Sequence, residues 1–268
     1  MSYVIAFDAA TEHVAIGLAA VGTDAAPTMV AGVDFSAPRA ALGRLLPAVD
    51  ELLETAGVSR ADIVAVAVGR GPGSFTGVRI AVASAKGLAH GLGVPLVGLG
   101  TLDAVAWRFA DEDALVGIVG DAMRGEVYPC LFRCGGGRCE RIGEYRVSKP
   151  AVAAAAWAAM ADAPTILAGN GLAKYVDVFR AELGDRVLIA DESLWTPTGA
   201  SVVSAAFAER DTPSLSGIFA DPTHAHTFAH PGILLPVYTR LSDAEEAETL
   251  RGGTTPGSGV AGPSGGAA

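Results

Sequence analysis

Residues 4–18 read VIAFDAATEHVAIGL, and residues 116–131 read VGIVGDAMRGEVYPCL. In each stretch an apolar strand ends in an aspartate, Asp8 or Asp121, and a tight turn leads into a second apolar strand. A valine follows six residues after each aspartate, and a leucine follows ten residues after it. A pattern that recurs within one chain indicates two structural units of the same kind.

The segments around these stretches repeat in the same order. In the first half, apolar periodicity and turn residues predict eight elements. In chain order they are strands 3–8, 13–21 and 28–35, helix 39–56, strand 62–68, helix 77–91, strand 95–99 and helix 101–110. The second half is predicted as strands 115–120, 126–133 and 139–147, helix 151–162, strand 165–169, helix 171–183, strand 186–190 and helix 197–209. The chain is therefore predicted to be an α/β protein with two ββαβα-type halves, residues 1–110 and 111–210.

The C-terminal part of the chain departs from this pattern. Residues 211–250 contain one apolar stretch, ILLPVY, and are predicted to return to the core. Residues 251–268 consist mainly of Gly, Ser, Pro, Ala and Thr, which bury too little apolar surface to fold. We expect a disordered tail there.

Composition limits the classes of function. The chain has 268 residues, with 19 Lys and Arg against 29 Asp and Glu, and its net charge is −10. This charge argues against a broad basic surface that could bind the phosphate backbone of a nucleic acid. Its N-terminus has neither the basic region of a signal peptide nor the length of a membrane span, and we expect a cytoplasmic protein that does not contact membranes. The chain has an odd number of cysteines, Cys130, Cys134 and Cys139, which is typical of reduced cysteines that lie on strands. Their spacing disfavours a zinc-binding site.

A glycine-rich turn, GRGPGSFTGVRI at residues 69–80, follows the strand at 62–68. Such a turn can expose backbone N–H groups at the start of a helix, and an anion can bind there. It matches neither the nucleotide-triphosphate loop nor the dinucleotide pattern, so a rigid strand-to-helix turn is the alternative. The candidate contacts for an anion or nucleotide are Asp8, Thr11, Arg70, Gly71, Gly73, Ser74 and Arg79.

Two helices of the first half carry long apolar or small-residue stripes. In residues 39–56 the leucines and valines recur at helical spacing, and in residues 77–91 alanines and glycines do so. Such faces can dock a helix of another protein, or they can pack against the chain's own sheet. The spacing alone leaves both alternatives open.

Several motifs resemble the bacterial TsaB (YeaZ) family: DAAT, LLPAVDELL, VAVGRGPGSFTGVRIAVASAKGLAHGLGVPLVGLGTLDA, VGDAMRGEVY and PVYTRLSDA. The resemblance implies an actin-like ATPase (ASKHA) fold made of two RNase H-like halves. It also implies a non-catalytic, cofactor-free subunit that works with the transferase TsaD and the ATPase TsaE in making N6-threonylcarbamoyladenosine in tRNA. By this resemblance tRNA is reached only through the complex.

The resemblance further implies that the two first-half helices dock TsaD, and that the same face can pair two copies of the chain. The residues expected at this interface are Leu42, Leu45, Leu46, Val49, Leu53, Val78, Val82, Ala85, Lys86 and Ala89.

Two other functions are considered. Asp8 and Asp121 lie where this fold often orients Mg²⁺ and phosphates, which would suit a nucleotide-binding or ATP-hydrolysing enzyme. His226 and His230 are four residues apart, as in helical metal sites of metallopeptidases, but Pro231 disfavours a helix at His230. We expect no bound metal.

Overall fold

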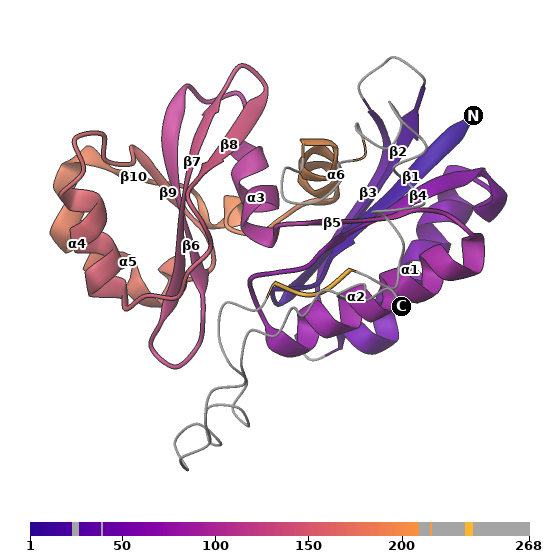
Figure 1. Ribbon diagram of the computed structural model, residues 1–268, viewed down its shortest axis with the longest axis horizontal. Helices are drawn as coiled ribbons and strands as arrows, with labels where there is room; N and C mark the ends of the chain where they lie inside the picture. The colour runs from indigo at the N-terminus through magenta and orange to yellow at the C-terminus, as the bar shows by residue number, and fades with distance from the viewer. Residues whose placement is uncertain (23–26, 39, 209–214, 216–233, 238–268) are drawn as a thin grey trace, which may run out of the picture.

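The computed structural model describes residues 1–22, 27–38, 40–208, 215 and 234–237. Within these residues the chain forms two five-stranded sheets with helices on their faces (Figure 1). The first sheet has the order β3-β2-β1-β4-β5 and consists of β1 (Ser2–Asp8), β2 (His13–Val21), β3 (Thr28–Ser36), β4 (Ile63–Gly69) and β5 (Leu96–Leu99).

The second sheet repeats this arrangement. It consists of β6 (Ala114–Asp121), β7 (Val127–Gly135), β8 (Arg138–Ile142), β9 (Ile166–Ala168) and β10 (Leu188–Ile189). Its order, β10-β9-β6-β7-β8, is that of the first sheet read backwards, and in both sheets the first three strands are antiparallel and the later ones parallel. The predicted duplication and α/β class are confirmed, and the architecture is that of the actin-like fold with two RNase H-like halves.

Helices cover both sheets. They are α1 (Ala41–Ala56), α2 (Phe75–Leu92), α3 (Thr101–Ala106), α4 (Pro150–Ala158), α5 (Leu172–Leu183) and α6 (Gly199–Ala208), with 3₁₀ turns η1 (Arg60–Asp62), η2 (Trp107–Phe109), η3 (Gly184–Arg186) and η4 (Glu192–Leu194). α1 and α2 pack on one face of the first sheet, and α4 and α5 pack on one face of the second (Figure 1). β8 is shorter than the predicted strand 139–147, and the predicted helix 101–110 is α3 followed by η2.

The two halves exchange a helix. α3, from the first half of the sequence, packs Leu102 and Val105 into the core of the second sheet, beside Ile118. α6, from the second half, packs on the remaining face of the first sheet, and both helices lie between the two sheets (Figure 1). The predicted boundary at residue 110 separates the two repeats in the sequence, but α3 and α6 each pack against the sheet of the opposite half.

The contact of α6 with β2 is very close. A Cβ atom on Gly199 would lie 2.1 Å from the carbonyl oxygen of Ile16, and one on Gly17 would lie 2.3 Å from the carbonyl oxygen of Gly199. Only glycine at both positions lets the two backbones approach this closely.

Most of the expected interface residues are buried inside the chain itself, and for these the prediction of an exposed docking face was wrong. The core against the first sheet takes up Leu45, Val49, Leu53, Val78, Val82, Ala85 and Ala89, each no more than 4% exposed. The apolar stripes are the inward faces of α1 and α2, because each helix must bury one face against the sheet it covers.

The cysteines also differ from the expectation. Cys134 on β7 and Cys139 on β8 are directly opposite each other and form a disulfide, whereas Cys130 is buried and not part of the disulfide. Among the described residues, no helix has both the length and the apolar character needed to cross a bilayer. The segments 216–233 and 238–268, which include the histidine pair and the tail predicted to be disordered, lie outside the described residues.

Candidate functional site

Asp8 ends β1 and is fully buried at the junction of the two halves. Its Oδ1 accepts a hydrogen bond from the Ala10 N–H (2.7 Å), and its Oδ2 accepts one from the Thr101 hydroxyl (2.6 Å). Burial raises the pKa of the Asp8 carboxyl, and these two hydrogen bonds partly oppose that rise. Asp8 is thus held entirely by groups of its own chain.

Gly69 makes room for this carboxylate. A Cβ atom at residue 69 would lie 1.7 Å from Asp8 Oδ2, so no other residue type fits while Asp8 keeps its position. Gly69, the first glycine of the motif, is therefore required because the Asp8 side chain packs against it.

Several N–H groups of the glycine-rich turn donate to other groups of the chain. The N–H of Gly71 donates to the Thr101 hydroxyl (3.2 Å), and the N–H of Ser74 donates to the carbonyl of Ala10 (2.7 Å). The Ser74 hydroxyl caps α2 by accepting from the N–H of Gly77 (3.3 Å). These contacts favour the rigid strand-to-helix turn over an anion cradle.

The two arginines of the turn point to different surroundings. The Arg79 guanidinium lies 3.6 Å from the centre of the Phe75 ring, a cation–π contact on the first turn of α2. The Arg70 side chain lies over β5, where a Cβ on Gly98 would meet its Cδ at 2.8 Å. No described contact brings these two guanidinium groups together.

Asp121 occupies the equivalent position at the end of β6, but, unlike Asp8, it is paired with a cation. The Lys174 ammonium on α5 forms an ion pair with its Oδ2, and the Met123 N–H donates to its Oδ1 (3.0 Å). The hydrogen bond to Asp121 raises the pKa of Lys174. An Asp121 carboxylate that holds a metal-bound phosphate would have to be unpaired. Here the Lys174 ammonium is already paired with it.

A small pocket lies beside Asp121 and Thr101. Its lining residues come from both halves: Thr11, Pro72, Gly73, Thr101, Leu102, Val105, Gly120, Asp121, Tyr128, Gly169, Asn170 and Trp195. Its volume is about 10 Å³, the space of roughly one water molecule, whereas small-molecule sites enclose about 300–1,000 Å³. The pocket in this conformation is too small for a nucleotide; two of the predicted anion contacts, Thr11 and Gly73, line it.

The outward sides of α1 and α2 form the second candidate site. Leu42 is 75% exposed and Leu46 40% exposed on α1, while Ala83 and Gly87 are exposed on α2 and Lys86 is half-buried. We call these five residues the outer helical face. Of the ten predicted interface residues, it keeps Leu42, Leu46 and Lys86.

The chain is similar to several known proteins. A family model described as "TsaD: tRNA N6-adenosine threonylcarbamoyltransferase" matches residues 36–206. The tRNA threonylcarbamoyladenosine biosynthesis protein TsaB of Escherichia coli (strain K12) is 41% identical over 128 residues, 47% of this chain and 52% of that protein. TsaB of Bacillus subtilis (strain 168) is 28% identical over 205 residues, 75% of this chain and 80% of that protein.

A solved structure of an uncharacterised Pseudomonas aeruginosa protein, described as similar to the peptidase YeaZ, superimposes with a TM-score of 0.68 and 30% identity, covering 90% of this chain and all (100%) of that chain. The chain belongs to the TsaB (YeaZ) family. Its match to the E. coli relative spans about half of that protein's length (52%).

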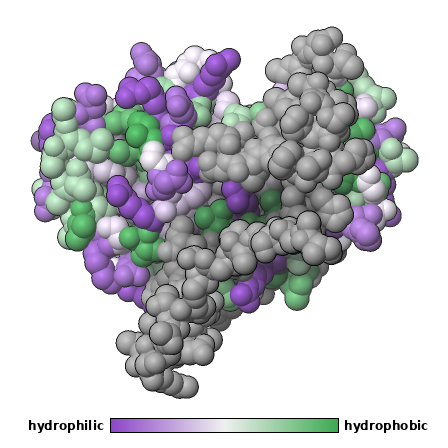
Figure 2. Space-filling view, viewed as in Figure 1, coloured by the Kyte–Doolittle hydropathy of each residue, from purple (hydrophilic) through white to green (hydrophobic). Residues whose placement is uncertain are grey.

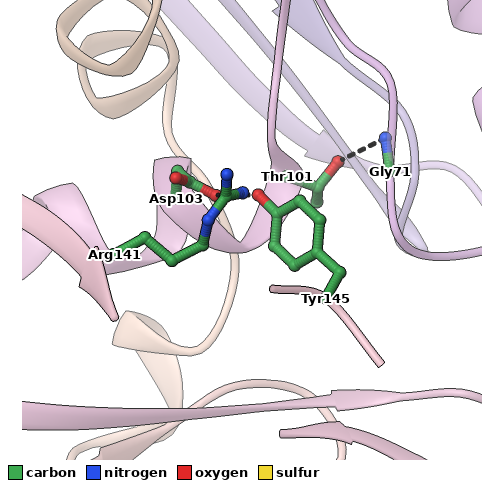
Figure 3. Close-up of polar contacts among 5 residues, drawn as sticks. All are labelled: Gly71, Thr101, Asp103, Arg141 and Tyr145. Carbon is green, nitrogen blue, oxygen red and sulfur yellow. Dashed lines mark hydrogen bonds and ion pairs between the residues drawn. The ribbon is translucent and has the colours of Figure 1, made fainter. Parts of the chain in front are cut away.

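Sequence reasoning missed a polar cluster beside the first aspartate of this TsaB-family chain. The carboxylate of Asp103 on α3 accepts from the Tyr145 hydroxyl and from the Arg141 guanidinium on β8 (3.2 Å), and Arg141 stacks on the Tyr145 ring at 4.0 Å (Figure 3). Thr101, in the same helical turn, also binds the Gly71 N–H (Figure 3). No local pattern indicates these contacts, since the partners are 30 to 42 residues apart.

The described residues contain no group of three His, Cys, Asp or Glu side chains placed to hold a metal ion. His226 and His230, the predicted rival metal pair, lie outside them.

Proposed function

We propose that this chain is the non-catalytic partner subunit of a TsaD-type transferase in the formation of N6-threonylcarbamoyladenosine in tRNA. One observation carries the proposal. Both aspartates at the strand ends are engaged by donors of the same chain, Asp8 by Thr101 and Asp121 by Lys174. Lys174 already balances the charge of Asp121, and Asp8 is fully buried with both of its oxygens hydrogen-bonded, so neither carboxylate is well placed to hold a metal ion.

The pathway is supported by what the relatives are called. The E. coli and B. subtilis relatives are named as tRNA threonylcarbamoyladenosine biosynthesis proteins, and the matching family model describes the transferase. The match to the transferase model indicates that this chain and the transferase are related in fold. Two subunits with the same fold can differ in function, so the transferase can carry out the reaction while this chain only supports it.

We assign the outer helical face as the surface that receives the transferase. Leu42 and Leu46 are one helical turn apart, and the small side chains of Ala83 and Gly87 let a partner helix approach α2 closely. The same face would serve a homodimer, which then competes with the transferase. An ATPase of the TsaE type would join as a third component.

Charge supports an indirect route to tRNA. With a net charge of −10, the chain repels a phosphate backbone at long range, so the transferase is expected to hold the nucleic acid. A nucleotide-hydrolysing enzyme is less well supported, because the pocket beside Asp121 has a volume of only about 10 Å³.

The docking surface is tested by the double variant Leu42→Glu/Leu46→Glu. Two buried charges in an interface would each cost about 2 kcal/mol or more, so affinity for the purified transferase should fall by at least about a hundredfold in calorimetric titration. Circular dichroism and the melting temperature should stay near those of the unchanged chain, because both side chains are exposed in the free subunit.

Val152→Glu is the matched control. Val152 is 62% exposed on α4 of the other half. Green and pale green apolar residues gather at the left edge of the molecule in Figure 2, the side on which α4 lies in Figure 1. This variant adds one negative charge, half of what the double variant adds, to an exposed apolar helix face, and it should bind the transferase as the unchanged chain does. If the double variant binds normally, or if Val152→Glu weakens binding equally, the outer helical face is not the docking surface.

A further inference from the structure

The tip of the β7–β8 hairpin carries two cysteines that the proposed function does not use. Cys134 and Cys139 are directly opposite each other on the two strands, with Cα atoms 4.2 Å apart, and the turn between them contains Gly135, Gly136 and Gly137. Cys134 is 2% exposed, whereas Cys139 is half-buried. The third cysteine, Cys130, is buried and not part of the disulfide.

The surroundings of the pair suit both of its redox states. The carbonyl oxygen of Ala106, at the end of α3, lies 3.0 Å from Cys139 Sγ and 3.6 Å from Cys134 Sγ. When the disulfide is reduced, each sulfur becomes a weak donor, and either thiol can donate to this oxygen. Neither the closed disulfide nor the open dithiol then leaves a buried donor unsatisfied.

The pair also stands next to the junction of the two halves. Arg141 is two residues beyond Cys139 on β8, so both side chains point to the same face of the sheet, toward α3. Arg141 binds Asp103, which shares a helical turn with Thr101, the residue that holds Asp8. The position of β8 against α3 is therefore linked to the position of the first aspartate.

We propose that Cys134 and Cys139 are a reversible redox pair, whose oxidation fastens β7 to β8 at the tip of the hairpin, beside the end of α3. The oxidant is a low-molecular-weight disulfide. The half-buried Cys139 loses its proton to solvent and attacks one sulfur of that disulfide, which releases one small thiolate. Cys134, after losing its own proton, attacks the Cys139 sulfur and displaces the second small thiolate.

The two released thiolates take up protons from solvent. Two protein thiols are thereby oxidised by two electrons to one protein disulfide, and one small disulfide is reduced to two small thiols. An excess of the small thiol reverses both steps.

The test uses the full chain equilibrated in mixtures of reduced and oxidised glutathione, quenched with acid and alkylated with N-ethylmaleimide in denaturant. Mass spectrometry should find three alkylated thiols under reducing conditions and one, Cys130, under oxidising conditions, with a peptide that joins Cys134 to Cys139. Amide hydrogen exchange across residues 138–145 should be at least about tenfold faster in the reduced chain, because the hairpin is no longer fastened.

Single substitutions separate this pair from other thiol chemistry. Cys130→Ser should leave the transition unchanged, and Cys134→Ser should stop at a glutathione adduct on Cys139. Three thiols that persist in excess oxidised glutathione, a disulfide that includes Cys130, or hydrogen exchange that is equal in both states would each overturn the proposal. The test does not depend on the transferase, so it is independent of the proposed function.

Discussion

Asp8 and Asp121 hold the same place in the two halves, yet the chain treats them differently. Asp8 is fully buried and keeps only uncharged partners, whereas Asp121 is paired with the ammonium of Lys174. The duplicated sequence pattern identified both aspartates. It could not identify Thr101 or Lys174, because these partners lie 93 and 53 residues away along the chain and their contacts exist only after folding.

The buried carboxyl gives a prediction about pH. Since burial raises the pKa of Asp8, the folded chain holds this proton at pH values where the unfolded chain, with an ordinary pKa of about 3.9, has released it. As the pH rises from about 4 through the folded-state pKa, the folded chain must ionise a buried group, and the free energy of unfolding decreases. Asp8→Asn removes this titration.

We therefore expect the stability of Asp8→Asn relative to the unchanged chain to increase between about pH 4 and pH 7. Urea unfolding at several pH values measures this difference. A difference that stays constant across the range would mean that Asp8 does not ionise with a raised pKa.

At the scale of elements, the apolar periodicity located the helices well. The predicted helices 39–56 and 77–91 are observed at Ala41–Ala56 and Phe75–Leu92. The same periodicity could not distinguish a core face from a docking face, because both require an apolar stripe. Leu45 and Val82 proved to be core residues, and the exposed Leu42 and Leu46 belong to the outward side of α1.

The contact between α6 and β2 gives a second prediction. Gly199→Ala would place a Cβ 2.1 Å from the carbonyl oxygen of Ile16, so the helix must shift, and we expect a loss of about 1–3 kcal/mol in urea unfolding. Gly43→Ala is the control within α1, where nothing lies within 4 Å of the new Cβ. It should stabilise the chain by about 0.5–1 kcal/mol, because alanine favours a helix interior more than glycine does. Equal effects of the two substitutions would contradict the close packing of α6.

At the scale of the whole molecule, the exchange of α3 and α6 binds the halves into one unit. Arg108 adds to this link by donating to the carbonyls of Ser193 (2.6 Å) and Thr196 (3.1 Å), and Asp34 on β3 accepts from the N–H of Gly199 (2.8 Å). The sequence predicted two similar halves in the right order. The exchange escaped prediction because α3 and α6 have nothing in their local patterns that selects one sheet over the other.

This exchange predicts a single cooperative unfolding transition. Neither sheet keeps its full core when the other half unfolds, so the calorimetric and van't Hoff enthalpies should agree. Two resolved transitions in scanning calorimetry would instead show that residues 1–110 and 111–210 fold as separate domains.

The rate of threonylcarbamoyl transfer to tRNA, measured in a mixture of this chain with a TsaD-type transferase and a TsaE-type ATPase, tests the central claim most directly. The account predicts that Asp8→Asn/Asp121→Asn keeps the rate within about twofold, whereas Leu42→Glu/Leu46→Glu lowers it at least about a hundredfold at limiting subunit concentration. The opposite result, in which the folded aspartate variant still binds the transferase but abolishes transfer while the leucine variant supports it, would show that this chain supplies a reacting group.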